Sequence, residues 1–280
     1  MEQGVLYVVA TPLGNLGDLS PRAQETLAQV ALIAAEDTRH SARLLRHFGI
    51  KTPLIALHEH NERERSAELI ARLKAGDALA LISDAGTPLI SDPGYTLVRA
   101  AHAERLRVCP IPGPCALIAA LSASGLPSDR FAFEGFLPAR ATARRAHLTT
   151  LQHETRTLIF YEAPHRLQDS LSDMCAVFGA ERQAVLAREL TKIFETVRND
   201  SLQGLCDFVH ADPQQQKGEC VILVQGAPAP LALEHTIALD SETLLRALLT
   251  ELPVKQAVRL AAAISGVKKN DLYDLALRLK

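Results

Sequence analysis

Short apolar runs alternate with amphipathic segments along most of the chain. Apolar runs of this length are typical of buried strands, and apolar residues that recur every three or four positions are typical of helices. In the first half, the pattern predicts strands at 5–10, 78–83 and 107–111. It predicts helices at 65–76, from Pro93 and from Pro114, and another that starts at Ser20 and Pro21 and includes Leu27, Val30, Ala31 and Ala34.

The second half repeats this alternation. A helix is predicted at 165–179, and strands are predicted at 157–162, 184–189 and 220–226. Strands that alternate with helices of this length indicate an α/β protein with largely parallel sheets.

The composition changes at 226–240, where prolines and small residues predict a linker. Beyond it, 241–252, 254–265 and 268–280 have the pattern of three short helices. The last two flank a glycine-containing turn of the length found in helix-turn-helix units. Two interpretations stay open: a helical cap on the main body, or a nucleic-acid contact through Lys268 and Lys269.

Composition narrows the class of protein. The chain has 280 residues, is 48% hydrophobic and has a formal net charge of −2, which fits a globular protein with more than one domain. It has no apolar run of membrane-spanning length, and its start lacks the pattern of a signal peptide, so we expect a cytoplasmic protein without a membrane partner. The five cysteines are scattered without a Cys-x-x-Cys pair, which argues against a disulfide framework or a zinc site.

Three turns rich in glycine and proline follow predicted strands, at 10–18, 83–88 and 112–116. Ligands of open α/β sheets bind at this edge, and glycine lets the backbone approach them closely. None of the turns has the glycine spacing of a dinucleotide or triphosphate loop. One carboxylate, that of Asp84, together with many backbone amides suits a ligand with an adenosyl group and a positive charge.

Seven stretches of the sequence together resemble a known family. The chain is similar to the ribosomal RNA small subunit methyltransferase I family, a branch of the tetrapyrrole methylase superfamily, essentially from Val5 to Lys280. The stretches are 6–23 (LYVVATPLGNLGDLSPRA), 32–50 (LIAAEDTRHSARLLRHFGI), 57–62 (LHEHNE), 81–98 (LISDAGTPLISDPGYTLV), 110–138 (PIPGPCALIAALSASGLPSDRFAFEGFLP), 158–167 (LIFYEAPHRL) and 187–195 (ARELTKIFE).

The resemblance implies two α/β domains of tetrapyrrole methylase type with the cofactor in the cleft between them, a small C-terminal helical segment, and a homodimer. We place the domains at 1–113, 114–228 and 238–280. The implied reaction is S-adenosylmethionine-dependent 2′-O-ribose methylation of a cytidine (cytidine 1402) in the decoding region of 16S rRNA, in the small ribosomal subunit. The implied cofactor-binding residues are Pro12, Asp84, Thr87, Cys115 and Ala116 from the first domain, and Tyr161, Arg188 and Gly218 from the second. This chain has Ser-Asp-Ala at 83–85, where many tetrapyrrole methylases have Gly-Asp-Pro, and we expect Cys115 to be a small packing residue.

A ribose hydroxyl is a poor nucleophile while it keeps its proton, so a base or a cation near the developing alkoxide would help. We expect Glu189 and Lys192 to be that catalytic pair, with Arg39 and His60 positioning the RNA. Arg140, Arg144 and Arg145 lie in a loop that leads into a helix, where they could bind phosphates or form an exposed helix face. His58 and His60 lack a third ligand at suitable spacing, so we expect no metal site.

Two other functions remain open from the residues alone. A methyltransferase acting on a tetrapyrrole or another small molecule would keep the three turns but would not need the arginine-rich segment or the terminal helices. A non-catalytic nucleic-acid-binding regulator would use the terminal helices and leave the three turns unexplained.

Overall fold

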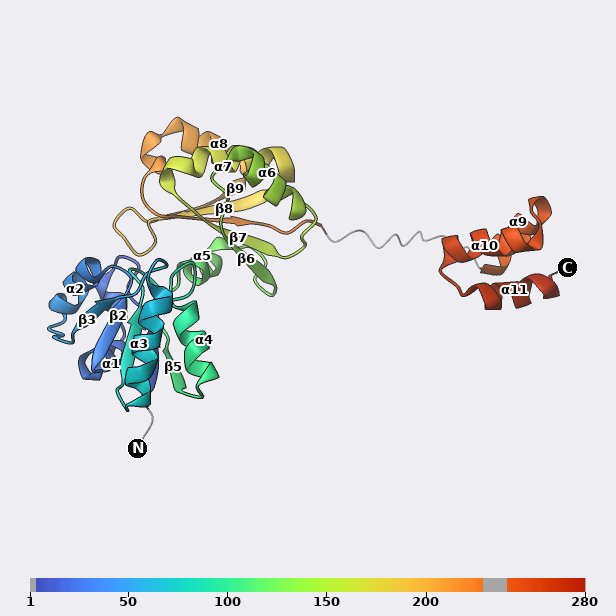
Figure 1. Cartoon of the computed structure of the whole chain (residues 1–280). Helices are drawn as coiled ribbons and strands as arrows, with labels where there is room; N and C mark the ends of the chain where they lie inside the picture. Colours follow the sequence, from blue (N-terminus) through green and yellow to red (C-terminus); the bar gives the residue numbers. More distant parts are fainter. Residues whose placement is uncertain (1–3, 229–240, 280) are drawn as a thin grey trace. The chain divides into compact units, whose positions relative to one another are not determined.

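The computed structural model describes residues 4–228 and 241–279. The chain divides into two compact units, Met1–Ala227 and Pro228–Lys280 (Figure 1). The first unit contains two sheets, one from residues 5–111 and one from residues 131–224. We call 4–111, which contains the first sheet, the first lobe, and 116–227, which contains the second, the second lobe. The predicted boundary at 113/114 stays a prediction, and the one at 238 lies outside the described residues.

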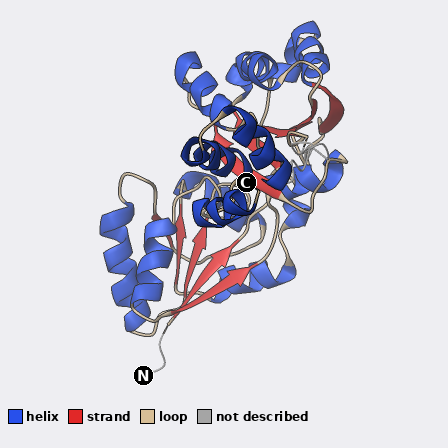
Figure 2. Cartoon of the chain, turned by 90° about the vertical axis from the view of Figure 1, so that its right-hand side faces the viewer, coloured by secondary structure: helices blue, strands red, loops and turns tan. Residues whose placement is uncertain are grey.

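The first lobe contains a five-stranded sheet in the order β3-β2-β4-β1-β5, in which every pairing is parallel. Its strands are β1 (Val5–Val9), β2 (Leu32–Ala35), β3 (Leu54–Ala56), β4 (Leu79–Ile82) and β5 (Arg107–Ile111). Its helices are the short 3-10 helix η1 (Leu16–Asp18) and α1 (Pro21–Gln29), α2 (Thr38–His47), α3 (Glu62–Lys74) and α4 (Tyr95–Ala103). Figure 2 shows the strands of this sheet in red with helices on both sides.

Both faces of the first sheet are covered. Leu6 of β1 packs in a cluster with residues of α3 and α4, whereas Val9 of the same strand packs in another cluster with residues of α1 and α2. A sheet that is buried on both faces has strands that are apolar throughout. This is why β2 and β4 are buried at every position.

One helix prediction in this lobe is wrong. The helix that starts after Ser20 ends at Gln29 rather than continuing to Ala34, and 32–35 form β2 between β3 and β4. A short apolar run fits a buried strand and a buried helix equally well in its periodicity, so the pattern could not separate them. The cap at Ser20, whose hydroxyl accepts from the Ala23 N–H, is where the sequence predicts it.

The second lobe contains a mixed five-stranded sheet in the order β6-β7-β10-β8-β9. Its strands are β6 (Phe131–Phe136), β7 (Thr157–Glu162), β8 (Gln183–Arg188), β9 (Thr196–Ser201) and β10 (Cys220–Val224). Only β6 and β7 pair in parallel. The prediction of largely parallel sheets is therefore wrong for this lobe. The short segment 189–195 joins β8 directly to β9, and a connection of that length permits only antiparallel pairing.

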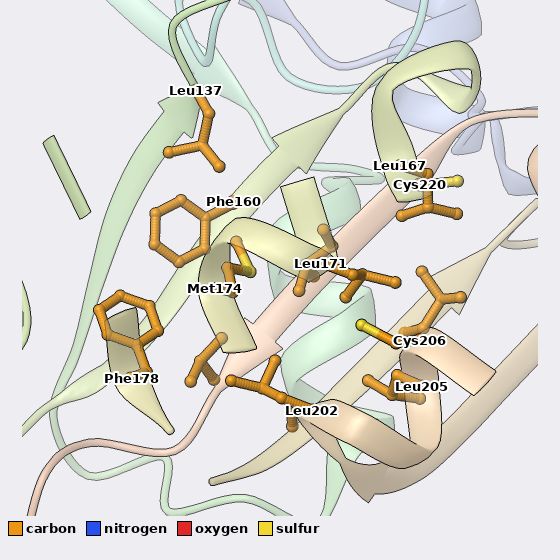
Figure 3. Close-up of a cluster of buried hydrophobic side chains, with 14 of the residues drawn as sticks. Leu137, Phe160, Leu167, Leu171, Met174, Phe178, Leu202, Leu205, Cys206 and Cys220 are labelled. Carbon is orange, nitrogen blue, oxygen red and sulfur yellow. The ribbon is translucent and has the colours of Figure 1, made fainter. Parts of the chain in front are cut away.

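Helices cover this sheet on both faces too. They are α5 (Ala116–Ser124), α6 (Ala141–Thr150), α7 (Leu167–Phe178) and α8 (Leu202–Ala211), with the 3-10 helices η2 (Pro164–Arg166) and η3 (Pro213–Gln216). Phe160 of β7 packs on α7 and α8 in the cluster shown in Figure 3, which includes Met174 and Leu205. Ile159, the neighbouring residue, packs on the opposite face with Leu121 of α5.

The unit at the C-terminal end has three helices in its described part, α9 (Ser241–Glu251), α10 (Val254–Ser265) and α11 (Lys269–Arg278), as the sequence predicts. Leu245, Val258 and Leu272 bring the three helices together in a small core. Gly266 ends α10 in the left-handed conformation, which glycine adopts without strain. Among the described helices, none is long and apolar enough to cross a membrane.

Candidate active site

The three turns predicted as a ligand site lie side by side because β4, β1 and β5 are neighbours in the sheet. Thr11 and Gly86 exchange two backbone hydrogen bonds of 2.8 and 3.0 Å, which join the first turn to the second. The Thr87 hydroxyl donates to the carbonyl of Pro114 at 2.9 Å and joins the second turn to the third. The turns therefore form one hydrogen-bonded floor at the carboxyl edge of the sheet.

A cavity of about 420 Å³ opens on this floor, between the two lobes. Its lining includes Asp84 and Thr87 from the second turn, Ala116 at the start of α5, and Tyr161 and Leu190 from the second lobe. This volume falls within the range of small-molecule and cofactor sites, about 300–1,000 Å³.

Four of the eight predicted cofactor-binding residues line the cavity: Asp84, Thr87, Ala116 and Tyr161. Pro12 and Cys115 do not line it themselves, but their chain neighbours Leu13 and Ala116 do.

Arg188 and Gly218, two other predicted cofactor-binding residues, are absent from the lining. The Arg188 guanidinium donates to the carbonyls of Lys217 and Phe194, which ties β8 to neighbouring segments. Gly218 gives room to Glu189, because a Cβ at this position would come within 2.3 Å of the Glu189 carboxyl group.

The charged residues that line the cavity are all acidic, and the described part of the chain contributes no lysine, arginine or histidine to the lining. Two of the carboxylates have counter-charges: Glu162 lies 3.3 Å from Arg166, and Glu219 lies 3.1 Å from Lys192. The remaining three have no ion pair within the described residues. They are Glu36, Asp84 and Asp92.

Burial and repulsion by neighbouring carboxylates hold protons on Glu36 and Asp92 more tightly than usual. Burial raises the pKa of Asp92 to about 6, and repulsion by Glu36 and Asp84 adds to it, against a hydrogen bond from Ser83. Burial also raises the pKa of Glu36, with repulsion by Asp84 as the next cause. The neighbouring carboxylates therefore raise the free energy needed to keep Glu36 and Asp92 charged.

The backbone before Asp92 is folded in an unusual way. Leu89 and Ser91 have φ values of 72° and 65°, in the left-handed region that residues with a Cβ rarely adopt. Gly94 follows with φ 124°, and a Cβ there would meet the side chain of Leu81 at 2.6 Å. Glu36 and Asp92 were not among the site residues predicted from the sequence. Glu36 directly follows β2, an apolar strand that ends at this edge, whereas Asp92 lies ten residues after the end of β4 and has no such local signal.

Glu189 and Lys192 form an ion pair at the rim of the cavity. Lys192 Nζ lies 2.8 Å from Oε1 of Glu189 and 3.1 Å from Oε2 of Glu219, which lines the cavity. The N–H of Glu219 donates to the same Glu189 oxygen at 2.9 Å. Glu189 itself has φ 51°, a strained conformation for glutamate that turns its carboxylate back over Gly218.

The hydrogen bonds decide the charge of this pair. Burial alone would raise the pKa of Glu189, but the bonds from Lys192 and from the Glu219 N–H outweigh it, and the pKa is lower than usual. Burial would lower the pKa of Lys192, but its bonds to Glu189 and Glu219 outweigh burial and raise the pKa. Both groups are therefore ionised at neutral pH, and Lys192 is a cationic donor rather than a base.

Gly14 of the first turn lies against Lys192. A Cβ on Gly14 would come within 2.5 Å of Lys192 Cγ, so the glycine makes the space through which the lysine side chain passes. This contact links the first lobe to the segment 189–195 of the second lobe. The absence of a side chain at position 14 is thus part of how the cation is held beside the cavity.

Two other ionisable groups that line the cavity stay neutral. Burial raises the pKa of the Tyr161 phenol, whose oxygen accepts the Leu117 N–H at 3.2 Å. Burial raises the pKa of the Cys220 thiol to about 12, so it is not a nucleophile at neutral pH.

One of the predicted RNA contacts is wrong. The Arg144 side chain is only 4% exposed and its Nε lies 2.7 Å from Asp173, an equally buried carboxylate of α7. A buried guanidinium that neutralises a buried carboxylate cannot also bind a phosphate in solvent. Arg145 binds the other Asp173 oxygen, yet its side chain remains 63% exposed, and Arg140 is exposed before α6.

The other predicted RNA contacts lie at the surface. The Arg39 side chain is 89% exposed and pairs with Asp37, and His60 is exposed after β3. Lys268 and Lys269 are exposed at the start of α11. Among the described residues, no group of three histidine, cysteine or acidic side chains has the arrangement of a metal site.

Known families match nearly all of the chain. The family of tetrapyrrole (corrin/porphyrin) methylases matches residues 5–206, and the RsmI C-terminal HTH domain matches residues 235–280. A ribosomal RNA small subunit methyltransferase I of Pseudomonas aeruginosa is 63% identical over 99% of this chain and 98% of its own length. The chain belongs to the ribosomal RNA small subunit methyltransferase I family. The resemblance stated from the sequence is thereby confirmed, and the helix-turn-helix reading of the terminal helices agrees with the second match.

Two other relatives of the same name also match over nearly their whole length. Proteins of the same name from Escherichia coli O157:H7 and Synechocystis are 54% and 48% identical to this chain, over 98% and 99% of its length and 95% and 99% of theirs. Solved structures share the fold at low identity. The methyltransferase CobJ has a TM-score of 0.59 at 19% identity, covering 80% of this chain and 95% of its own. A uroporphyrin-III-C-methyltransferase of Thermus thermophilus has a TM-score of 0.53 at 20% identity, covering 80% and 94%.

Proposed function

We propose that this protein transfers the methyl group of S-adenosylmethionine to the 2′-hydroxyl of a cytidine in the 16S rRNA of the small ribosomal subunit. Relatives that match along nearly their whole length are named ribosomal RNA small subunit methyltransferases, which supports the RNA substrate. The observation that carries the cofactor assignment is the cavity with three carboxylates that have no counter-charge in the described chain. Such a site favours a cation and disfavours phosphates.

The cavity fits S-adenosylmethionine in size and charge. This cofactor supplies a methyl group on a positively charged sulfur, which needs no further activation. The residues that would hold it are Asp84, Thr87 and Ala116 on the floor and Tyr161 on the opposite wall. Gly86, with φ 85°, keeps the floor open, since a Cβ there would press on Leu13 at 3.2 Å.

The acceptor hydroxyl needs help to lose its proton as the new O–C bond forms. Lys192 is a fixed cation at the cavity rim, so it can stabilise negative charge that develops on the ribose oxygen. Glu189 holds Lys192 in place and, because its pKa is low, does not itself take the proton. This assignment separates the two predicted catalytic residues into a stabilising cation and its positioning partner.

RNA docking is proposed for exposed cations. Arg140 precedes α6 and Arg145 lies within it, whereas Arg39 lies in the first turn of α2 and His60 lies in the loop after β3. Lys268 and Lys269 would provide further phosphate contacts from the helix-turn-helix unit. Removing phosphate contacts weakens binding and flattens its salt dependence, so Arg145→Ala should do both while leaving the rate at saturating RNA unchanged. A homodimer in the cytoplasm remains a prediction, and light scattering of the purified chain tests the dimer.

The test incubates the full chain with methyl-labelled S-adenosylmethionine and small ribosomal subunits from cells that lack the protein. Mass spectrometry of the nucleosides should then detect 2′-O-methylcytidine, and ribonuclease mapping should locate it in 16S rRNA. A parallel reaction with a uroporphyrinoid in place of the subunits tests the small-molecule alternative. Label in the porphyrinoid and none in RNA would overturn the proposal, as would methylation on a base.

A further inference from the structure

The two sides of the cavity differ in how their acidic groups are compensated. Glu162 and Glu219, from the second lobe, have Arg166 and Lys192 beside them. Glu36 and Asp92, from the first lobe, have no cation beside them in the described chain, although each faces Asp84. The excess negative charge is therefore concentrated on the first-lobe side.

The fold itself brings these first-lobe carboxylates together at one edge of the sheet. Glu36 follows β2 and Asp84 follows β4, the neighbouring strand, and the Asp37 N–H donates to Asp84 at 3.0 Å across that edge. Asp92 reaches the same cavity at the end of the turn with two left-handed residues. Like charges held together without counter-charges raise the free energy of the protein. A bound cation relieves that repulsion.

We propose that Glu36 and Asp92 make the cavity select the positively charged sulfonium of S-adenosylmethionine over the uncharged thioether of S-adenosylhomocysteine. This inference rests on the proposed function and concerns the specificity of the same site. Methyl transfer breaks the S–C bond, whose electron pair stays on sulfur, and forms an O–C bond to the ribose oxygen. The hydroxyl proton passes to solvent, and the ligand in the cavity has lost its positive charge.

The two ligands are alike in their adenosine, amino and carboxylate groups. They differ by one methyl group and one charge, so the field of Glu36 and Asp92 acts on the difference between them. A unit charge at a partly screened site contributes about 1 kcal/mol, which corresponds to about fivefold in affinity. The product would therefore bind less tightly than the substrate, which favours its replacement by a fresh molecule of cofactor.

The test is calorimetry of the full chain with each ligand separately. The variants are Glu36→Gln and Asp92→Asn, which keep the shape of the side chain and remove its charge. The measured ratio is the dissociation constant of S-adenosylhomocysteine divided by that of S-adenosylmethionine. Each variant should lower this ratio by about fivefold, mainly by weakening the binding of S-adenosylmethionine. Glu59→Gln is the matched control, because this exposed glutamate lies near Glu36 but outside the cavity lining, and its removal should leave the ratio unchanged.

The parent protein gives a second measurement that needs no variant. The groups facing Asp92 are Glu36 and Asp84 at the strand ends, the Ser83 hydroxyl and Tyr161 of β7. As pH falls from 8 to 5, Asp92 gains a proton around its pKa of about 6, so the ratio should fall as well.

The outcomes separate this inference from the proposed function. A ratio that is unchanged in both variants overturns the inference, as does an equal weakening of both ligands, which would mean that the carboxylates bind a shared part. A parent ratio that is independent of pH overturns it too. Failure of the parent to bind either ligand would instead overturn the proposed function.

Discussion

The two lobes of the first unit differ in the charged groups that surround their buried and half-buried carboxylates. In the second lobe, buried carboxylates lie beside guanidinium or ammonium groups, as with Asp173 between Arg144 and Arg145. In the first lobe, Glu36 and Asp92 face the cavity with other carboxylates as their charged neighbours. A charge that is paired inside the protein stabilises that protein or holds a catalytic group, whereas an unpaired one costs free energy until a ligand arrives. In the proposed function, the first lobe accordingly binds the positively charged cofactor, and Lys192 of the second lobe acts on the acceptor hydroxyl.

Among the tests of this difference between the two lobes, the largest effect is expected at Lys192. Lys192→Ala should lower the single-turnover methylation rate at saturating RNA by about 10²–10³-fold, the usual loss when one donor to a developing oxyanion is removed. S-adenosylmethionine should bind at least as tightly as in the parent, because the variant leaves every carboxylate of the cavity in place. Rapid-quench time courses on small ribosomal subunits measure the rate, and calorimetry measures the binding.

Lys217→Ala is the control for this variant, because Lys217 is an exposed lysine nearby in the chain that does not itself line the cavity. Its rate should match the parent. Recovery of the full rate by the Lys192 variant at high RNA concentration would make Lys192 a docking residue instead.

The next effect concerns stability. Arg144→Ala should lower the free energy of unfolding by about 3 kcal/mol, because it leaves the buried Asp173 with only one, mostly exposed, partner. Arg145→Ala should cost less than about 1 kcal/mol, as exposed ion pairs do. Urea denaturation of both variants measures the difference. Equal losses of unfolding free energy would mean that the two arginines stabilise Asp173 equally and that their difference in burial has no effect.

A smaller effect is expected on the floor of the cavity. Asp84→Ala removes a carboxylate that lines the cavity and accepts the Asp37 N–H, so S-adenosylmethionine should bind about tenfold more weakly. Asp84→Asn keeps an acceptor for Asp37 and isolates the loss of charge. Calorimetry on folded variants, checked by circular dichroism, gives both constants. Unchanged affinity in both would remove Asp84 from the cofactor site.

The smallest effect tests whether the first lobe is destabilised by its own charge. The pKa of Asp92, raised by burial to about 6, lies above its ordinary value of 3.8, so the folded protein binds this proton more tightly than the unfolded chain. This contribution to stability is present at low pH and is lost as pH rises from about 4 through 6. Asp92→Asn should therefore raise the free energy of unfolding at pH 7 by about 1 kcal/mol, after allowance for partial solvent screening.

Stability curves of the ligand-free parent and the Asp92 variant between pH 4 and 8 measure this gain. The two curves should converge near pH 4, where Asp92 is largely protonated. A loss of stability at pH 7 would show that the Asp92 charge is compensated, and the contrast between the lobes would then fail.

The sequence by itself determined the elements with strong local signals. The apolar runs that became β1, β4, β5, β7, β8 and β10 are visible in the pattern, as are the cap at Ser20 and the three terminal helices. The three turns could be predicted to meet, because turns after parallel strands share one edge of a sheet. The family itself was identified from motifs spread along the whole chain.

Only the tertiary structure decided which charges are compensated. Nothing local marks Arg144 as buried, because its partner Asp173 lies on another helix and the two meet only when α6 packs on α7. Glu36 and Asp92 are far apart in sequence and become one acidic group because β2 and β4 are neighbours in the sheet. The same is true of Lys192, which passes over Gly14 of the other lobe. Hydrophobic periodicity is a property of a few successive residues, whereas burial, ion pairing and pKa depend on neighbours that the fold brings in from elsewhere.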